Sequence, residues 1–284
     1  MPLVLGVLSV RIVLSVRIAH CNQSAIRNRK VSQIWPALLY IVRHGESAGN
    51  VAREAATLAG DRTIDIDTRD VDVPLSDLGV QQAEALGRWF ATLPTAETPN
   101  IILTSPYLRA RHTAEIVAQS AGLSQDKFTV VVDERLREKE FGVLDRLTKV
   151  GIEAYHPDQA EFRRLLGKFY HRPPGGESWC DVILRLRSGI EMISREYCGE
   201  RVLLVGHSVV VLCLRYLIEH MTEEQILRID RENEVANCSV TSYRYDGSVA
   251  PRGKLRLELF NFVAPLEEAG APVTSEPDAK VAAK

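Results

Sequence analysis

The chain has 284 residues, 45% of them hydrophobic, and a formal net charge of -2. A chain of this length can bury one substantial core, so we expect one main domain. The near-zero net charge removes any bulk electrostatic reason to expect nucleic acid or an acidic membrane as a partner. The five cysteines are odd in number and form no Cys-x-x-Cys pair, which is typical of reduced thiols in a cytoplasmic protein.

Both ends of the chain differ from its middle. Residues 1–36 are predicted to be a basic, poorly ordered extension, because residues 1–40 lack Asp and Glu and their arginines interrupt the apolar run before it could span a bilayer. The basic residues are Arg11, Arg17, Arg27, Arg29 and Lys30. Such a start also resembles a transit peptide, so organellar targeting, disorder and an artefactual extension all stay open. Residues 264–284, rich in Ala, Pro, Glu and Lys, are predicted to be a disordered tail. The domain then spans residues 37–263.

From Pro36 onward, short β-branched runs alternate with longer amphipathic ones, a pattern typical of α/β layer folds. Near-continuous apolar runs such as residues 202–205 indicate strands that are covered on both faces. We therefore predict a three-layer sandwich, with helices on both faces of a mostly parallel central sheet. The predicted strands are Leu38–Val42, Ile101–Leu103, Thr129–Val132, Val202–Val205, Ser239–Tyr245 and Leu255–Phe260.

Helical spacing predicts core-facing helices between these strands. Apolar residues recur every three or four positions from Val80 to Leu93 and again from Val182 to Tyr197. Ser105-Pro106 offers an N-cap and an N1 proline for a third helix. Residues 178–181 resemble a capping box for the helix that follows them.

Polar segments follow three of the predicted strands, at residues 43–45, at Arg109 and at residues 206–208. Ligands of open α/β sheets bind beyond the carboxyl ends of the strands. If these strands are parallel neighbours, one pocket contains Arg43, His44, Arg109 and His207. Two arginines, two histidines and the positive ends of the following helices predict an anion site suited to a phosphoryl group. Taken singly, His207 is more typical of a hydrogen-bonded structural residue and Arg109 of a surface charge; their repeated placement at strand ends favours function.

Six ordered motifs resemble those of the histidine phosphatase superfamily, which includes the cofactor-dependent phosphoglycerate mutases. They are Tyr-Ile-Val-Arg-His-Gly-Glu-Ser-Ala-Gly-Asn at 40–50, Pro-Leu-Ser-Asp-Leu-Gly-Val-Gln-Gln-Ala at 74–83, Thr-Ser-Pro-Tyr-Leu-Arg-Ala-Arg-His-Thr-Ala at 104–114, Leu-Arg-Glu-Lys-Glu-Phe-Gly at 136–142, Pro-Gly-Gly-Glu-Ser at 174–178 and Val-Gly-His-Ser at 205–208. The resemblance extends from Leu38 to Val263.

The resemblance implies roles for residues at matched positions. His44 would become phosphorylated, and Glu138 would give a proton to the leaving oxygen. The implied catalytic residues are Arg43, His44, Arg109, Glu138 and His207, of which the arginines and His207 would hold the phosphoryl oxygens. Asn50 would help, and Ser208 is a further substrate-binding candidate, although the family pattern often has His-Gly where this chain has His207-Ser208.

Phosphoryl transfer depends mainly on positioning and on charge neutralisation. Two arginines and a histidine can neutralise charge as a metal would, and the sequence has no Asp cluster or His-x-His spacing. We therefore expect no metal and no cofactor. A neutral imidazole at His44 can attack in line, and Gly45 allows a close backbone approach. The leaving alkoxide needs a proton from a buried carboxylic acid. Glu138 is the candidate for this acid and Glu140 its rival. The alternative interpretation of either residue is a solvated surface carboxylate without a catalytic role.

Two polar stretches are expected to flank the pocket. Residues 53–72 mix Asp with Arg and have few large apolar side chains, which predicts a loop. Residues 145–174 are basic and aromatic, and either form a lid that selects the substrate or an ordinary amphipathic helix. We favour the helix, because an apolar stripe at helical spacing contains Phe162, Leu165, Leu166 and Phe169.

These observations predict a metal-independent phosphomonoester hydrolase that acts on a small phosphorylated substrate through a phosphohistidine. No nucleic-acid or membrane partner is expected, and a homodimer is possible. In the mutases the matching glutamate precedes a His-Tyr-Gly run and an insertion with paired arginines, whereas residues 140–142 here are Glu-Phe-Gly. Arg163-Arg164 could imitate those arginines, so a mutase is the alternative. A non-catalytic phosphate-binding module is the third possibility, although neither nucleophile nor acid is lost.

Overall fold

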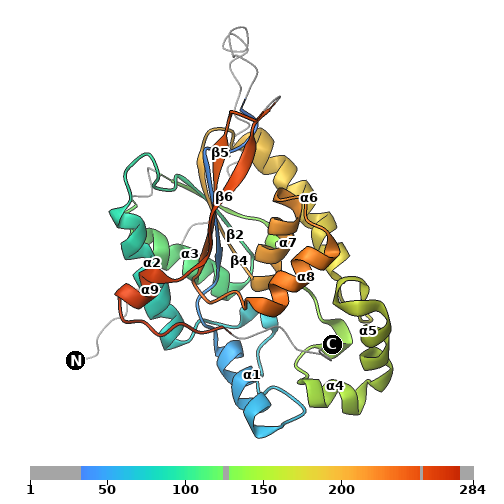
Figure 1. Cartoon of the computed structure of the whole chain (residues 1–284). Helices are drawn as coiled ribbons and strands as arrows, with labels where there is room; N and C mark the ends of the chain where they lie inside the picture. The colour runs from blue at the N-terminus through green and yellow to red at the C-terminus, as the bar shows by residue number, and fades with distance from the viewer. Residues whose placement is uncertain (1–32, 124–127, 250–251, 276–284) are drawn as a thin grey trace, which may run out of the picture. The chain divides into compact units, whose positions relative to one another are not determined.

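A six-stranded sheet with the order β3-β2-β4-β1-β5-β6 forms the centre of the domain that follows residue 32. The computed structural model describes residues 33–123, 128–249 and 252–275. The strands are β1 (Leu38–Arg43), β2 (Ile101–Thr104), β3 (Thr129–Val132), β4 (Arg201–Gly206), β5 (Val240–Asp246) and β6 (Lys254–Phe262), as labelled in Figure 1. β1 to β4 pair in parallel, and β5 is antiparallel to both of its neighbours, β1 and β6. The six predicted strands are confirmed, with boundary differences of one or two residues.

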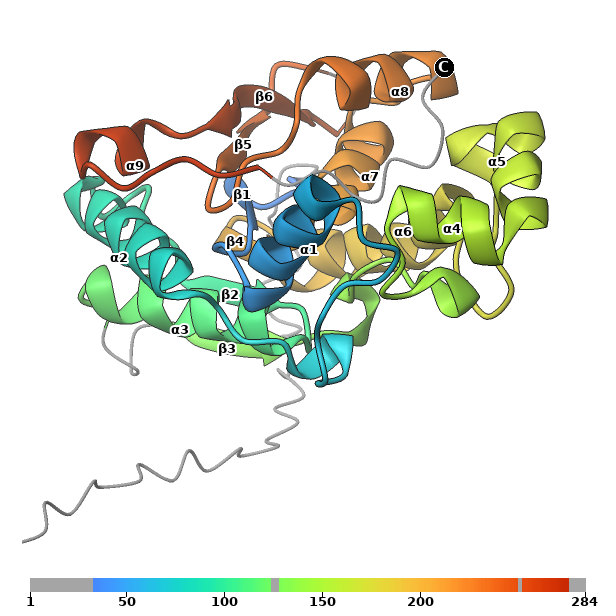
Figure 2. The ribbon, with the colours of Figure 1, turned by 90° about the horizontal axis from the view of Figure 1, so that it is seen from below.

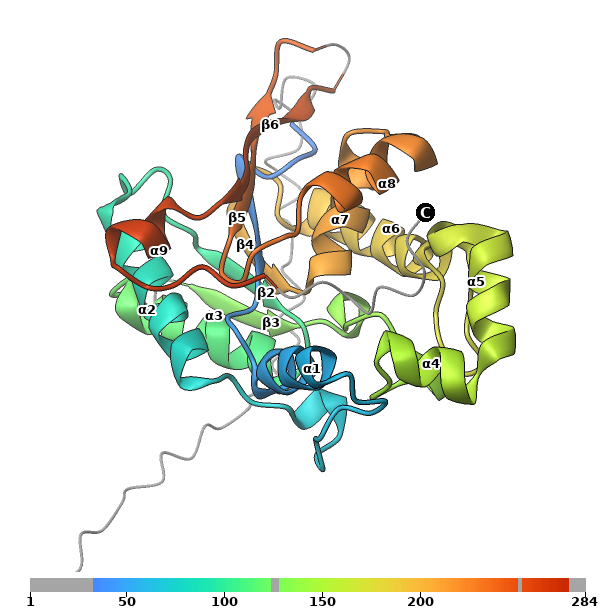
Figure 3. The same ribbon diagram turned by 60° about the horizontal axis from the view of Figure 1, so that its bottom comes forward.

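Helices cover both faces of this sheet, which confirms the predicted three layers. They are α1 (Ala48–Ala59), α2 (Asp77–Thr92), α3 (Leu108–Ser120), α4 (Lys149–Tyr155), α5 (Pro157–Tyr170), α6 (Trp179–Glu196), α7 (Ser208–Ile218), α8 (Glu223–Glu232) and α9 (Ala264–Glu268), with short 3₁₀ turns η2 (Asp70–Asp72), η3 (Glu134–Leu136) and η4 (Gly142–Leu144). Figures 2 and 3 show α2, α3 and α9 on one face and α6, α7 and α8 on the other.

The alternation of side chains along each strand explains the two cores. In β1, Leu38, Tyr40 and Val42 pack with apolar residues of α2 and α3. The intervening Leu39 and Ile41 pack with residues of α6 and α7. Successive strand residues point to opposite faces, so an uninterrupted apolar strand needs a helical layer on each side.

Helix starts agree with the sequence in one case and differ in another. α6 begins with the predicted capping box, in which Ser178 and Asp181 exchange side-chain to backbone hydrogen bonds. The predicted N-cap at Ser105 is wrong, because α3 begins only at Leu108 after an extended Tyr107. The Ser105 hydroxyl lies instead 2.8 Å from Nε2 of His207.

The stretches expected to flank the pocket contain more helix than predicted. Residues 53–59 belong to α1 and residues 70–72 form the turn η2, so the predicted loop is confined to residues 60–69 between them. The helical interpretation of residues 145–174 is right, but the apolar stripe does not face the core as a whole: Leu165 is 62% exposed, whereas Phe169 is 4% exposed and packs in the core. Gly167 has a left-handed φ of 76° inside α5 and breaks the helical register between them.

The packed part of the chain continues beyond the predicted boundary at residue 263. Leu266 in α9 is 0% exposed and joins the core cluster of α2 and α3. The carbonyl of Pro272 accepts a hydrogen bond from Gln82, and that of Thr274 accepts one from the Asn237 amide. The predicted disorder of residues 264–275 is therefore wrong, because one buried leucine and backbone hydrogen bonds anchor a segment of polar composition. Residues 1–32 and 276–284 lie outside the described residues. No helix in the described residues is long and apolar enough to cross a membrane.

Candidate active site

The carboxyl ends of β1, β2 and β4 meet at one edge of the sheet. Arg43 pairs with Gly206 in register, and the His44 amide donates to the Gly206 carbonyl at 2.9 Å. The Ser105 amide donates to the Val205 carbonyl at 3.0 Å. The predicted parallel adjacency of these strands is therefore confirmed, and it brings together side chains that are far apart in the sequence.

His44 directly follows β1 and is 3% exposed. Its Nδ1 lies 2.7 Å from the Gly45 carbonyl oxygen. A carbonyl oxygen can only accept, so Nδ1 carries the proton and Nε2 keeps its lone pair. The Asn237 side chain donates to the His44 carbonyl at 3.0 Å, which anchors the backbone.

Burial lowers the pKa of His44 well below its ordinary value, and the charges of Arg109 and Arg43 lower it further. The imidazole is therefore neutral at physiological pH. A neutral, buried imidazole with an available lone pair is the form of histidine that acts as a nucleophile.

Arg109 reaches the same place from the first turn of α3. Its Nε lies 3.3 Å from Nε2 of His44. Its Nη1 donates to the Asp70 carbonyl at 2.7 Å and to the Asp70 carboxylate at 3.0 Å. Arg43 is also buried and donates from Nη1 to the Val235 carbonyl at 2.6 Å. Two buried guanidinium groups beside one imidazole bring positive charge to the site, and the Asp70 carboxylate balances part of it.

Glu138 and His207 complete the cluster. Nδ1 of His207 lies 3.3 Å from Oε2 of Glu138, while Oε1 of Glu138 accepts from the Lys139 amide at 2.8 Å. The His207 and His44 rings are 5.1 Å apart between centroids. Burial lowers the pKa of His207 well below its ordinary value, and Arg109 lowers it further, so this second imidazole is neutral as well.

A model of the histidine phosphatase superfamily, branch 1, matches residues 39–252. The chain belongs to the histidine phosphatase superfamily. It is 31% identical over 212 residues to a probable phosphoglycerate mutase, GpmB, of Photorhabdus laumondii, which covers 74% of this chain and 86% of that one. It is 31% identical over 200 residues to a 2,3-bisphosphoglycerate-dependent phosphoglycerate mutase of Gloeobacter violaceus, which covers 69% of this chain and 82% of that one.

Solved structures of phosphatases and related proteins match the same part of the fold. The native structure of a mycobacterial glucosyl-3-phosphoglycerate phosphatase has a TM-score of 0.59 and 26% identity, and the match covers 80% of this chain and 99% of that one. YhfR of Bacillus stearothermophilus has a TM-score of 0.61 and 28% identity, with 81% of this chain and 98% of that one covered.

In this superfamily member, a cavity opens beside His44 where most of the predicted site residues converge. Its lining includes the predicted residues Arg43, His44, Asn50, Arg109 and Glu138. His207 lies behind this lining, in contact with Glu138 and Ser105. Ser208 begins α7 and is not part of the lining. Asn50 has a second role, because its side-chain oxygen accepts from the Ser47 amide at 3.0 Å and caps α1.

The rival acid and the paired arginines lie elsewhere. The Glu140 carboxylate accepts from the Tyr107 hydroxyl at 3.1 Å and is not among the lining residues. Arg164 is exposed and donates to Glu161 at 2.8 Å. Neither Arg163 nor Arg164 belongs to the lining that the described residues form. The geometry thus favours Glu138 over Glu140.

The sequence did not reveal several lining residues of the cavity. Asp70, which binds Arg109, lies within the predicted loop of residues 53–72, and its only signal was membership of a stretch expected to flank the pocket. The other unassigned lining residues include Arg53, Ile64, Ile66, Val73 and Arg146. Gly45 was expected to allow a close backbone approach, and a Cβ there would lie 2.5 Å from the Gly79 carbonyl oxygen of α2.

Among the described residues, the donor atoms of His44, Glu138 and His207 lie within 4.8 Å of one another, close enough in principle to bind a metal ion. The nearby charges of Arg43 and Arg109 disfavour a dication and favour an anion at the same place. The arginines around the cluster therefore make the site fit a phosphoryl group better than a metal ion.

Proposed function

We propose that the protein is a phosphomonoester hydrolase that transfers the phosphoryl group of a small substrate to His44 and then to water. The observation that supports this most directly is the orientation of His44. Its Nδ1 is tied to the Gly45 carbonyl, and its Nε2 lies beside Arg109. The lone pair thus points to where an anion would bind.

In the first step, Nε2 of His44 attacks phosphorus in line while the ester P–O bond breaks. Arg43 and Arg109 hold the phosphoryl oxygens and neutralise the charge that repels the nucleophile, while the neutral His207 lies behind them beside Glu138. Glu138 gives its proton to the leaving oxygen, so the substrate departs as an alcohol. The positive charge that forms on the imidazole is stabilised through Nδ1 by the Gly45 carbonyl.

In the second step, water attacks the phosphohistidine. Glu138, now ionised, accepts a proton from this water as the P–N bond breaks. Inorganic phosphate leaves, and both His44 and Glu138 return to their starting protonation states. Using one carboxyl group as acid and then as base follows from microscopic reversibility.

Hydrolysis is favoured over mutase chemistry by what surrounds the phosphoryl position. Part of the wall beyond it is apolar and includes Ile64, Ile66 and Val73. The pair Arg163-Arg164, which could have held a substrate carboxylate, lies outside the lining. A phosphatase among the structural relatives agrees with this choice.

Mutase activity is the second candidate, because Arg53 and Arg146 also line the cavity. Either guanidinium group could hold the carboxylate of an acidic triose. The relatives named as phosphoglycerate mutases support this alternative.

The deciding experiment supplies 3-phosphoglycerate with a trace of the bisphosphorylated form and follows 2-phosphoglycerate and free phosphate together. A parallel panel of simple monoesters measures phosphate release. Steady phosphate release with little isomerisation is expected. Fast isomerisation with little free phosphate would establish the mutase instead. Binding of phosphate without turnover of any ester would favour a non-catalytic module.

A further inference from the structure

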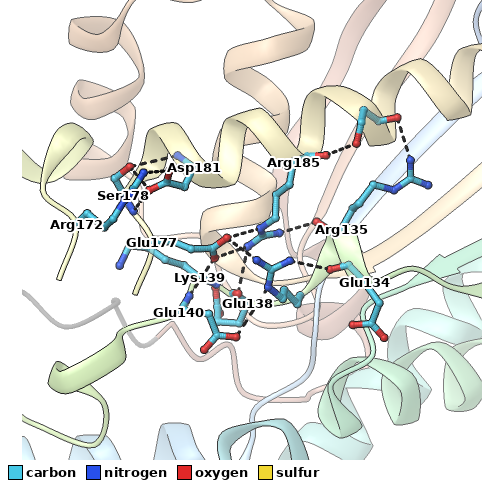
Figure 4. A network of polar contacts seen from close by, with 12 residues as sticks. Glu134, Arg135, Glu138, Lys139, Glu140, Arg172, Glu177, Ser178, Asp181 and Arg185 are labelled. Atoms are coloured by element: carbon cyan, nitrogen blue, oxygen red, sulfur yellow. Dashed lines mark hydrogen bonds and ion pairs between the residues drawn. The ribbon is translucent and has the colours of Figure 1, made fainter. Parts of the chain in front are cut away.

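A buried ion pair lies behind the segment that carries Glu138. Arg185 of α6 and Glu177, just before that helix, form a two-point contact with Nε–Oε1 at 2.9 Å and Nη2–Oε2 at 3.0 Å. Both side chains are nearly buried. Figure 4 shows the pair beside residues 134–140. Because desolvating two charges is costly, a buried pair of this kind requires further hydrogen bonds to be stable.

Those further bonds go to the backbone on both sides of Glu138. Arg185 donates from Nη2 to the Glu138 carbonyl at 3.1 Å and from Nη1 to the Arg135 carbonyl at 2.5 Å. The Glu177 carboxylate accepts from the Glu140 amide at 3.1 Å, and the Glu177 amide donates to the Glu140 carbonyl at 2.9 Å. The Arg185–Glu177 pair therefore makes hydrogen bonds to the backbone at three positions, residues 135, 138 and 140.

The segment has little regular structure of its own to fix this geometry. Glu138 lies between two 3₁₀ turns, because η3 ends at Leu136 and η4 begins at Gly142. Arg137 adds a contact to Glu177 at 2.7 Å. Burial would raise the pKa of Glu177, but the hydrogen bonds and charge of Arg185 outweigh it and lower that pKa, so the pair stays ionised.

We propose that Arg185, oriented by Glu177, is a positioning residue that holds the Glu138 carboxyl group where it can protonate the leaving oxygen. The inference rests on the proposed function, since it requires Glu138 to act as a general acid. Arg185 does not belong to the cavity lining, and its hydrogen bonds act on the position of Glu138 through the backbone of residues 135–138. A general acid displaced by a fraction of an ångström loses efficiency in proton transfer and not in substrate binding.

The choice of leaving group separates this role from a merely structural one. A p-nitrophenolate leaves without a proton, whereas a simple alkoxide must be protonated. Loss of the acid should therefore slow an alkyl phosphate much more than p-nitrophenyl phosphate, because general acid catalysis contributes about 10²- to 10⁴-fold. Glu138→Gln, which removes the acid, provides the reference.

The experiment measures kcat and KM for p-nitrophenyl phosphate and n-butyl phosphate with the wild type, Arg185→Ala, Arg185→Lys and Glu138→Gln. For Arg185→Ala we expect kcat/KM on the alkyl ester to fall about tenfold more than kcat/KM on the aryl ester, because kcat/KM reports the first step alone, whereas Glu138 serves both esters alike in the second step. Arg185→Lys keeps the charge but not the forked geometry, so it should show the same bias to a smaller extent. Arg187→Ala, an exposed position of the same helix, is the control and should behave as the wild type.

The ratio of the two rates is taken on one preparation, so it does not depend on the fraction of a variant that is folded. Equal losses on both esters for the two Arg185 variants would overturn the positioning role while leaving the proposed function intact. A wild-type protein that hydrolyses neither ester would overturn the proposed function and, with it, the inference.

Discussion

Nε of Arg109 lies 3.3 Å from Nε2 of His44, although the two residues are on different elements of the fold. The contact needs an imidazole that accepts, which is the tautomer that the Gly45 carbonyl imposes through Nδ1. The guanidinium group thus marks the direction of the lone pair, and a phosphoryl group held by Arg109 would lie close to the nitrogen that attacks it.

The first prediction is a phosphohistidine at His44. Labelled substrate should leave a label that survives alkali and is lost in acid, because the P–N bond is acid-labile. His44→Ala should carry no label and lose turnover, whereas His112→Ala, on the neighbouring α3, should keep both. Normal turnover by His44→Ala would remove His44 from the mechanism.

The second prediction separates two arginines of α3. Arg109→Ala should lower kcat/KM by about a hundredfold or more, because it removes a charge from the transition state in a buried site. Arg111 is two positions further on the helix, faces a different side and does not line the cavity, so Arg111→Ala should cost little in kcat/KM. Steady-state kinetics of both variants test this, and equal losses would mean that Arg109 does not hold the phosphoryl group.

The third prediction concerns Asp70, whose carboxylate forms an ion pair with Arg109. A phosphoryl group must compete with this carboxylate, which is 43% exposed. Asp70→Asn should therefore lower KM and the inhibition constant of inorganic phosphate about three- to tenfold, allowing for solvent screening. The Asp70 carbonyl still accepts from Arg109 at 2.7 Å, so the guanidinium group should stay in place. Weaker phosphate binding in Asp70→Asn would show that the carboxylate mainly orients Arg109.

The fourth prediction is that activity survives chelators. The positive charge that neutralises the phosphoryl group comes from Arg43 and Arg109, so dialysis against EDTA should leave kcat unchanged. The cluster of His44, Glu138 and His207 makes the test necessary, since their donor atoms lie close together. A complete loss of activity that added metal reverses would assign these residues to a metal site.

The fifth prediction is a loss of stability in mild acid. The folded-state pKa values of His44 and His207 are well below their ordinary 6.5. Below that pH the unfolded chain binds more protons than the folded one, so the free energy of unfolding falls as the pH falls. At about pH 5.5 each histidine should cost on the order of 1 kcal/mol relative to neutral pH.

Urea denaturation at these two pH values, in buffers without phosphate, measures this loss. His44→Gln removes one of the two groups, so the difference between neutral pH and mild acid should shrink by on the order of 1 kcal/mol. A difference that the substitution does not change would show that His44 is not kept neutral by the fold.

The amino-acid sequence by itself determined the secondary structure around the site. Strands such as Leu38–Val42 and Val202–Val205 are short, apolar and followed directly by polar residues, so their positions follow from neighbours within a few residues. The same local patterns placed His44, Arg109 and His207 at strand ends. Local patterns gave wrong predictions where a single residue decided the structure. Leu266 is buried although the tail around it is polar, and Gly167 interrupts the helix that carries the apolar stripe.

Only the tertiary structure decided how these pieces act on one another. Ser105 was predicted to cap a helix, yet its hydroxyl meets His207, which is 102 positions away. Asp70 binds Arg109 across 39 positions, and Arg185 holds the Glu138 carbonyl across 47. Hydrogen bonds and ion pairs act over about 3 Å in space, whatever the separation along the chain. Periodicity and propensity therefore locate the elements, and strand order and packing select the partners of each charged side chain.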